Sequence, residues 1–191
     1  MLRIAILLAV PACFQGIGPD LPDAGRATDS GPLGKVTTTP ASAGAFTTWI
    51  DSTSASEWTN LDLATGREGD VTAWDLRFQR FHISTNGGVS GAAGVEIVPV
   101  PDLGFADVTS APTAGWIADA PDGDDPNADP DYAFEQGVGW YDYNPTTHVV
   151  TPKPLVWVVR TRAGTAIKLE LLAYYDEAGT AGWFTVHWGP L

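Results

Sequence analysis

Residues 155–188 read LVWVVRTRAGTAIKLELLAYYDEAGTAGWFTVHW, and this stretch decides the fold class. In its middle part, from Ile167 to Tyr175, apolar side chains recur at every second position, which is the period of a strand with one buried face. Turn-forming residues at 163–164 and 176–179 separate this run from two other β-branched and aromatic runs. The sequence therefore predicts three consecutive antiparallel strands, over residues 155–161, 167–175 and 183–188.

Toward the N-terminus the chain shows further strand patterns and no amphipathic helix pattern of any length. In the longest of them, from Trp74 to Ser84, the alternation changes phase between Phe78 and Phe81. A phase change predicts a bulge, or a strand that passes between two sheets. The predicted fold class is all-β, with antiparallel sheets in a single domain. The predicted strands before the C-terminal third cover residues 47–51, 57–63, 74–84 and 95–98.

The N-terminus has the order of residues that is typical of a bacterial export signal. Arg3 gives a positive start, an unbroken apolar run extends from Ile4 to Val10, and Pro11-Ala12-Cys13 follows at once. The apolar run is too short to cross a bilayer, which takes about 20 residues. The last four residues, Val10-Pro11-Ala12-Cys13, resemble a lipobox, in which the cysteine is acylated, for example with palmitate, and becomes the new N-terminus. Cys13 is the only cysteine, so an intrachain disulfide is excluded.

This signal predicts how the whole chain is organised. Residues 1–12 are expected to be a signal peptide, and residues 13–43 a flexible, disordered tether, because glycine and proline are frequent there and no regular period persists. Residues 44–191 are expected to form the folded domain. The mature protein is expected to be exported and anchored by lipid on Cys13, at the outer membrane or the cell surface, where an outer-membrane receptor is a candidate partner.

Charge and motifs restrict the class of function. The formal net charge is −13, and the 10 basic residues are scattered. Nucleic-acid binding needs clustered basic residues, so the sequence excludes it. No glycine-rich phosphate loop follows a strand, and the glycines around Ser90 have the wrong spacing for the nucleophile elbow of a hydrolase. The sequence therefore predicts a binding protein and not an enzyme.

The three histidines have different settings. His148 follows a probable turn after Trp140, Tyr141 and Tyr143, so it is expected on a loop rim among aromatic residues, where a ligand site and turn capping are both open interpretations. His82 lies in a strand beside Phe81 and is expected to be a satisfied histidine near the core. The third histidine, His187, is expected to be solvated or at a sheet edge.

Residues 119–131 are rich in aspartate and also contain Asn127. Clusters of oxygen ligands favour calcium, and Asp122, Asp124 and Asp129 are the candidate ligands. The run lacks the glycine and terminal glutamate of an EF-hand. A solvated acidic loop is the simpler interpretation.

Three segments together resemble a known family. Residues 74–91, WDLRFQRFHISTNGGVSG, are similar to a segment of the HmuY-like haem-binding bacterial lipoproteins. Residues 140–143, WYDY, and residues 156–161, VWVVRT, resemble the C-terminal half of the same family, together with Gly164, Lys168-Leu169 and Tyr174-Tyr175-Asp176. The similarity extends from about Phe46 to Trp188.

The resemblance implies an all-β domain on a lipid anchor that binds haem or a related tetrapyrrole and serves iron acquisition. In that family, histidine or methionine side chains from loops hold the iron. His148 fits one such position, His82 is a further candidate, and Trp140, Tyr141 and Tyr143 are candidate walls for a flat apolar ligand. The alternative is a surface binding module without haem, with calcium bound at residues 119–131.

Overall fold

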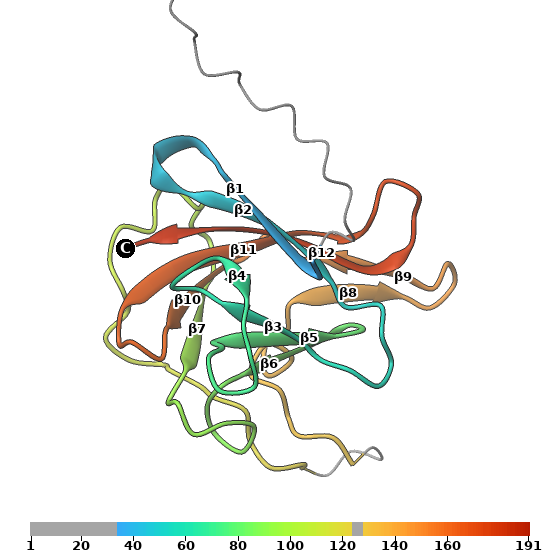
Figure 1. Ribbon diagram of the computed structural model, residues 1–191, viewed down its shortest axis with the longest axis horizontal. Coiled ribbons are helices and arrows are strands. Elements are labelled where there is room, and N and C mark those ends of the chain that lie inside the picture. Colours follow the sequence, from blue (N-terminus) through green and yellow to red (C-terminus); the bar gives the residue numbers. More distant parts are fainter. Residues whose placement is uncertain (1–33, 124–127) are drawn as a thin grey trace, which may run out of the picture. The chain divides into compact units, whose positions relative to one another are not determined.

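The chain folds into two antiparallel sheets and a separate hairpin (Figure 1). This is a computed structural model, and it describes residues 34–123 and 128–191. The predicted signal peptide, Cys13, residues 13–33 of the predicted tether, and Asp124 lie outside the described residues. One sheet has the order β1-β2-β12-β11-β10-β7, the second has the order β4-β3-β5-β6, and β8 pairs with β9. The strands are β1 (Val36–Pro40), β2 (Phe46–Asp51), β3 (Thr59–Asp62), β4 (Arg67–Glu68), β5 (Leu76–Gln79), β6 (His82–Thr85), β7 (Glu96–Val100), β8 (Tyr141–Asn144), β9 (Val149–Pro152), β10 (Val156–Arg160), β11 (Ala166–Tyr175) and β12 (Ala181–Pro190).

The predicted fold class is confirmed. The described part of the chain contains no helix apart from the three-residue 3₁₀ turn Ser42–Gly44. Strands β10, β11 and β12 are neighbours in the six-stranded sheet, as the three consecutive strand patterns predict. Along β11 the side chains alternate as expected as far as Leu171, with Leu169 fully buried and Lys168 and Glu170 partly exposed. Beyond Leu171 the register shifts, so Tyr174 is buried and Tyr175 only partly buried, which is the reverse of the predicted pattern.

The phase change in residues 74–84 has a different cause from the one predicted. The segment is not one strand with a bulge, and it does not pass between sheets. It is a hairpin in which β5 and β6 are joined by Arg80-Phe81, with Gln79 opposite His82. The two-residue turn reverses the chain, so Phe78 pairs with Ile83 and both are fully buried. Arg80 takes a positive φ of 52°, which is the backbone conformation that such a tight turn requires.

The folded domain starts earlier than predicted. The predicted tether includes residues 36–43, but Val36 to Pro40 form β1, an edge strand paired with β2 along its whole length. The side chain of Thr38 explains the pairing, because its hydroxyl lies 2.8 Å from the Thr48 hydroxyl and donates to the Gly66 carbonyl at 2.5 Å. Threonine is a good strand residue, and three consecutive threonines in a glycine- and proline-rich segment are the signal for this strand.

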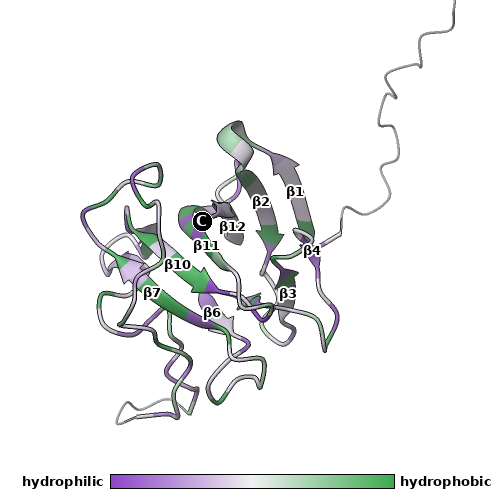
Figure 2. Cartoon of the chain, turned by 90° about the vertical axis from the view of Figure 1, so that its left-hand side faces the viewer, coloured by the Kyte–Doolittle hydropathy of each residue, from purple (hydrophilic) through white to green (hydrophobic). Residues whose placement is uncertain are grey.

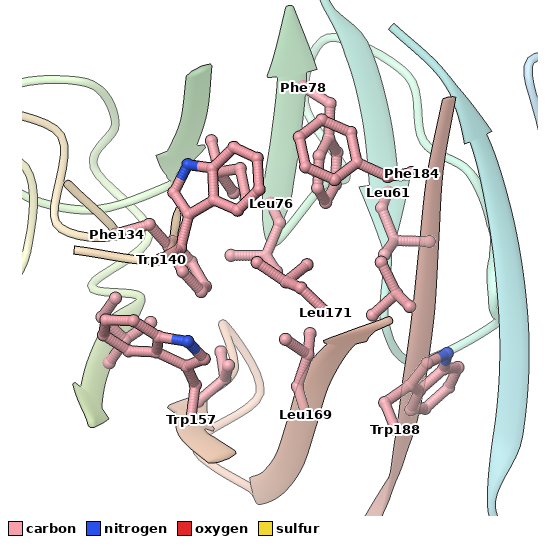
Figure 3. Packing of buried hydrophobic residues seen from close by; sticks show 14 of the residues in the cluster. Leu61, Leu76, Phe78, Phe134, Trp140, Trp157, Leu169, Leu171, Phe184 and Trp188 are labelled. Atoms are coloured by element: carbon pink, nitrogen blue, oxygen red, sulfur yellow. The ribbon is translucent and has the colours of Figure 1, made fainter. Parts of the chain in front are cut away.

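The core lies between the two sheets (Figure 3). Leu61 and Leu76 from the small sheet pack on the same cluster as Leu169 and Phe184 from the large sheet, and all four are fully buried. The other face of β10 is also covered, because Val156 and Val158 pack in a second, smaller cluster. In Figure 2 the hydrophobic colour accordingly follows β10. The partners of that second cluster are Val98, Val108, Val100, Phe105, Trp116 and Ala166.

Candidate functional site

A buried carboxylate fixes the loop that forms the site. Asp119 is 2% exposed, and its carboxylate accepts hydrogen bonds from the Ser84 hydroxyl at 2.7 Å, the Thr85 hydroxyl at 3.0 Å and the Ala133 amide at 2.9 Å. The Thr85 amide also donates to it at 3.1 Å. This carboxylate therefore joins β6 to both ends of the loop that contains residues 119–133. The prediction of a solvated acidic loop is wrong for Asp119, since its carboxylate is buried and accepts hydrogen bonds from backbone amides and hydroxyls.

A cleft of about 370 Å³ lies beside this loop. Its walls are one histidine from the start of β6 and a continuous loop segment from residue 129 to residue 137. The lining residues are His82, Asp129, Pro130, Asp131, Tyr132, Glu135, Gln136 and Gly137. The walls are mixed, with an imidazole and a phenol ring beside several carboxylates.

The imidazole in this cleft is held in place by a carboxylate. His82 Nδ1 lies 2.9 Å from Glu135 Oε1, and the His82 side chain is 20% exposed. Its ring contacts the rings of Phe81, at 4.1 Å between centroids, and Tyr132, at 5.1 Å. A carboxylate acceptor at Nδ1 keeps the proton there and leaves the Nε2 lone pair available, which is the arrangement that supports metal-ligating histidines. Among the described residues, none bonds to Nε2. Of the two ring nitrogens of His82, only Nδ1 thus has the hydrogen-bond partner that is expected for a histidine near the core.

The second wall of the cleft is aromatic. Burial, more than the nearby carboxylates, raises the pKa of Tyr132 to about 12, so its phenol stays protonated at neutral pH. The Tyr132 ring packs edge-on against Trp58 at 5.7 Å. Behind them the guanidinium of Arg77 lies between Trp58 and Trp74, at 4.5 and 4.9 Å from the ring centroids. These contacts pack Tyr132 against a cluster of aromatic rings and a guanidinium.

The hairpin of β8 and β9 carries a second pair of polar aromatic groups. The hydroxyl of Tyr143 lies 2.6 Å from Nδ1 of His148, and both residues are exposed. Asn144 shapes the turn between them, because its side chain accepts from the Thr146 and Thr147 amides and its carbonyl accepts from the His148 amide. His148 has a positive φ of 58°. His148 lies on a loop rim, as predicted, and contacts the phenol of Tyr143 there.

The two aromatic residues that precede Tyr143 have unequal positions. Trp140 is fully buried, and its Nε1 donates to the Phe81 carbonyl at 3.1 Å. It is therefore a core residue, whereas the sequence predicts it as a pocket wall. Tyr141 is half-buried, and its ring lies 6.1 Å from that of Phe81. Burial raises the pKa of Tyr141, and the neighbouring Glu135 adds to the shift. Tyr141 therefore packs the hairpin of β8 and β9 against the turn between β5 and β6.

The predicted calcium ligands are not brought together into a metal site. Asp122 is exposed, and Asp124 lies outside the described residues. Within residues 34–123 and 128–191 no group of three or more histidine, cysteine, aspartate or glutamate side chains could hold a metal ion. The structure thus gives no support to calcium at residues 119–131.

The prediction for His187 is wrong. The residue lies on β12, an inner strand of the large sheet, and its Nδ1 lies 2.8 Å from Glu170 Oε1. The Phe105 ring stacks on it at 4.1 Å between centroids, so the side chain is only 22% exposed. A strand pattern locates the face of His187 but cannot foresee a loop that folds over that face.

Sequence reasoning missed the two most important loop residues of the cleft, Tyr132 and Glu135. They follow the aspartate-rich run that ends at Asp131, and that acidic composition indicates solvent. The Asp-Tyr-Ala-Phe-Glu order of residues 131–135, with two aromatic residues in a polar run, is the available signal of a packed loop.

The part of the chain that the structure describes has no helix long and apolar enough to cross a membrane.

Fold and site together define an all-β domain with a histidine-containing cleft, which is lined by the start of β6 and by the loop of residues 129–137. The chain belongs to the HmuY family, since the family model, described as HmuY protein, matches residues 54–188. A comparison with curated protein sequences finds no match.

Solved structures share the fold. A Bacteroides vulgatus protein described as an HmuY-like haem-binding protein has a TM-score of 0.60 and 17% identity, over 81% of this chain and 96% of its own. The apo form of an HmuY analogue from Tannerella forsythia has a TM-score of 0.57 and 17% identity, over 84% of this chain and 100% of its own. A Bacteroides fragilis protein described as a lipoprotein has a TM-score of 0.60 and 19% identity, over 79% and 91%.

Proposed function

We propose that this protein is a lipid-anchored, exported haem-binding protein that serves haem or iron acquisition. The observation that carries the proposal is the match to the HmuY family over residues 54–188. The haem-binding description of the Bacteroides vulgatus relative supports it. The role is that of a carrier, so the site needs groups that hold a ligand and none that transform it.

The residues of the cleft fit a haem group by their chemistry. Bound haem would supply an iron that takes an imidazole or a phenolate as ligand. His82 offers an Nε2 lone pair, and Glu135 fixes the tautomer that makes it available. The aromatic rings of Phe81 and Tyr132 both contact that imidazole, and flat rings suit a flat apolar ligand. The acidic side chains of the cleft give the propionates no partner, so we expect modest affinity.

The membrane part of the proposal rests on the sequence. Val10-Pro11-Ala12-Cys13 supports a lipid on Cys13, and the lipoprotein description of the Bacteroides fragilis relative is consistent with it. An anchored domain at the outer membrane or cell surface could pass haem to a receptor in the outer membrane. The acyl chains would hold the domain there, because two or more chains make anchoring durable where one gives marginal binding.

A haem titration tests the function. Purified protein is titrated with ferric haem, and the Soret band is followed to saturation. We expect saturable binding, and we expect His82→Ala to weaken it by at least about tenfold, since it removes a candidate ligand. The matched control is His187→Gln, which alters the other half-buried histidine that pairs with a carboxylate. It should leave the titration unchanged. Absence of a saturable Soret change in the wild type at micromolar haem would refute the proposed function.

A further inference from the structure

A second cleft, of about 420 Å³, lies on the outer face of the small sheet. Asn60 of β3 and Arg77 of β5 are directly opposite each other in that sheet, and both line the cleft. Leu76 and Phe78, on either side of Arg77, are fully buried, so Arg77 points to the outer face. The lining residues of this small-sheet cleft are Glu57, Trp58, Asn60, Val71, Trp74 and Arg77. It shares no lining residue with the cleft of His82, and its volume is within the range of small-molecule sites.

The guanidinium of Arg77 is held in the small-sheet cleft with its outer nitrogens unused. It lies between Trp58 and Trp74, and its Nε donates to the Ser84 hydroxyl at 3.1 Å. Burial lowers the pKa of Arg77, because the guanidinium has lost part of its hydration. Among the described residues, none accepts a hydrogen bond from its two Nη groups. A fixed, partly dehydrated guanidinium with unpaired N–H groups favours a ligand that brings oxygen acceptors.

The small-sheet cleft also offers hydrogen-bond acceptors. Asn60 donates through Nδ2 to the Asp70 carbonyl at 3.1 Å, and its Oδ1 has no partner within residues 34–123 and 128–191. Glu57 pairs through Oε2 with Lys35 at 3.0 Å, which leaves Oε1 as an acceptor. An amide, a carboxylate and a guanidinium therefore line one cleft together with two indole rings.

The turn that carries Val71 is fixed in place. Asp70 Oδ1 accepts the amide and the hydroxyl of Thr72, both at 2.7 Å, and the Ala73 amide at 2.9 Å. At Gly69 a Cβ would lie 2.2 Å from the Ala73 carbonyl oxygen, so the backbone can approach this closely only because the residue is glycine. Val71 is 85% exposed in this turn. An apolar side chain held beside a cleft offers a ligand contact area at little cost in entropy.

We propose that the small-sheet cleft binds a neutral carbohydrate, a hexose unit of an oligosaccharide or polysaccharide. A hexose ring has faces of apolar C–H groups and a rim of hydroxyls that both donate and accept hydrogen bonds. The part of the Trp58 indole that lines the cleft and the Val71 side chain suit the faces. The Arg77 Nη groups donate to hydroxyl oxygens, while Glu57 and Asn60 accept from hydroxyls. The Glu57 carboxylate and the formal net charge of −13 disfavour an anionic sugar.

Titration of the haem-free protein with defined sugars tests this proposal. The neutral probes are maltohexaose, cellohexaose and mannohexaose, and hexagalacturonate is the acidic probe. Calorimetry and tryptophan fluorescence follow binding. We expect at least one neutral probe to bind saturably at millimolar concentration and to change the fluorescence, because two tryptophans line the cleft.

Three variants locate the sugar, and the thermal transition of each is checked first. Arg77→Met keeps an apolar stem between the indoles and removes the N–H donors, so it should weaken binding by about tenfold or more. Val71→Ser changes an exposed side chain and should weaken binding by about two- to fivefold, with the haem titration unchanged. Arg160→Met is the matched control, because the Arg160 guanidinium also lies over an indole, 4.0 Å from the Trp116 ring, but does not line the cleft. It should bind the sugar as the wild type does.

Three results would overturn the proposal: no binding of any neutral hexasaccharide, binding of hexagalacturonate alone, or wild-type affinity in both Arg77→Met and Val71→Ser. If Arg77→Met does not fold, Val71→Ser decides, since its side chain is exposed. The sugar titration contains no haem, so its failure leaves the proposed haem function untouched, and a failed haem titration leaves the sugar site untouched.

Discussion

Single residues of this protein show how much depends on a few buried polar groups. We predict that Asp119→Asn lowers the free energy of unfolding by roughly 3 kcal/mol, because an amide nitrogen would face amide and hydroxyl donors that are buried and left without an acceptor. Urea denaturation measures the effect. Asp122→Asn is the control, since it changes an exposed aspartate of the same loop and should stay within about 0.5 kcal/mol of the wild type. Equal stabilities of the two variants would contradict the structural role of Asp119.

Tyr132 predicts a dependence of stability on alkaline pH. Its pKa in the folded protein is about 12, against an ordinary value of 10.0. Between these two values the unfolded chain loses the phenol proton while the folded chain retains it, so the folded state binds more protons and its stability falls as pH rises. In Tyr132→Phe the unfolding free energy should fall less steeply over that window. Tyr141 and Tyr174, whose pKa values burial also raises, supply the remaining slope in both proteins.

A spectroscopic titration checks the same residue directly. Ionisation of phenols changes the ultraviolet absorbance. The titration curves of the wild type and Tyr132→Phe should differ by one phenol, which loses its proton at a higher pH than an ordinary tyrosine. Titration of that phenol near its ordinary value would mean that the cleft is wetter than its packing indicates.

At the level of single residues, the sequence could predict position better than surroundings. His148 lies on a rim as the turn pattern indicates, because Asn144 and the residues after it form a local structure. The burial of Trp140 and the pairing of His82 with Glu135 depend on segments far apart in the chain, and the distance between His82 and Glu135 in sequence is 53 residues. No local pattern contains that contact.

The strands show the same difference between what local patterns predict and what contacts between distant segments decide. The C-terminal strands β10, β11 and β12 could be predicted because short turns connect neighbours, so sequence order and spatial order agree. The sequence pattern of β5 and β6 predicts one strand instead of a hairpin, because Arg80-Phe81 lacks the glycine or asparagine that marks most two-residue turns. Three contacts explain why arginine is accepted there: its amide donates to the Ser52 carbonyl, its own carbonyl accepts from the Ser52 hydroxyl, and its guanidinium donates to the Thr53 carbonyl.

Strand β1 gives a prediction at this scale. A chain that starts at residue 44 should be less stable than one that starts at residue 34, by about 1–3 kcal/mol, because it loses the hydrogen bonds between β1 and β2. The loss is no larger because the shorter chain also avoids the entropy cost of ordering the five residues of β1. The bond between Thr38 and Thr48 is lost as well, and Thr48 also accepts from Trp188 in the core. Thermal denaturation of the two chains measures the difference. Identical midpoints would show that β1 adds nothing to the domain.

At the scale of the whole molecule, the anchor is the feature to test. We predict that Cys13→Ser leaves the protein without lipid and moves it from the membrane fraction to the soluble fraction, because the acyl chains supply the durable attachment. Fractionation of bacteria grown with labelled palmitate measures both effects. Haem binding should be unchanged in this variant, since all residues that line the cleft lie between His82 and Gly137. Label that still enters Cys13→Ser would place the lipid elsewhere.

The edge position of β1 has a mechanical consequence. A force that reaches the domain through the chain before Val36 acts at the open end of the ladder, where Val36 pairs with Ile50, and the connection to β2 lies at the opposite end, beside Pro40 and Phe46. When the load is directed across the ladder, it separates the residue pairs one after another and does not shear all of them together. The strand should therefore peel away at low force and re-form when the load falls. A domain pulled by its attachment would yield at β1 first, while the strands behind it keep the cleft intact.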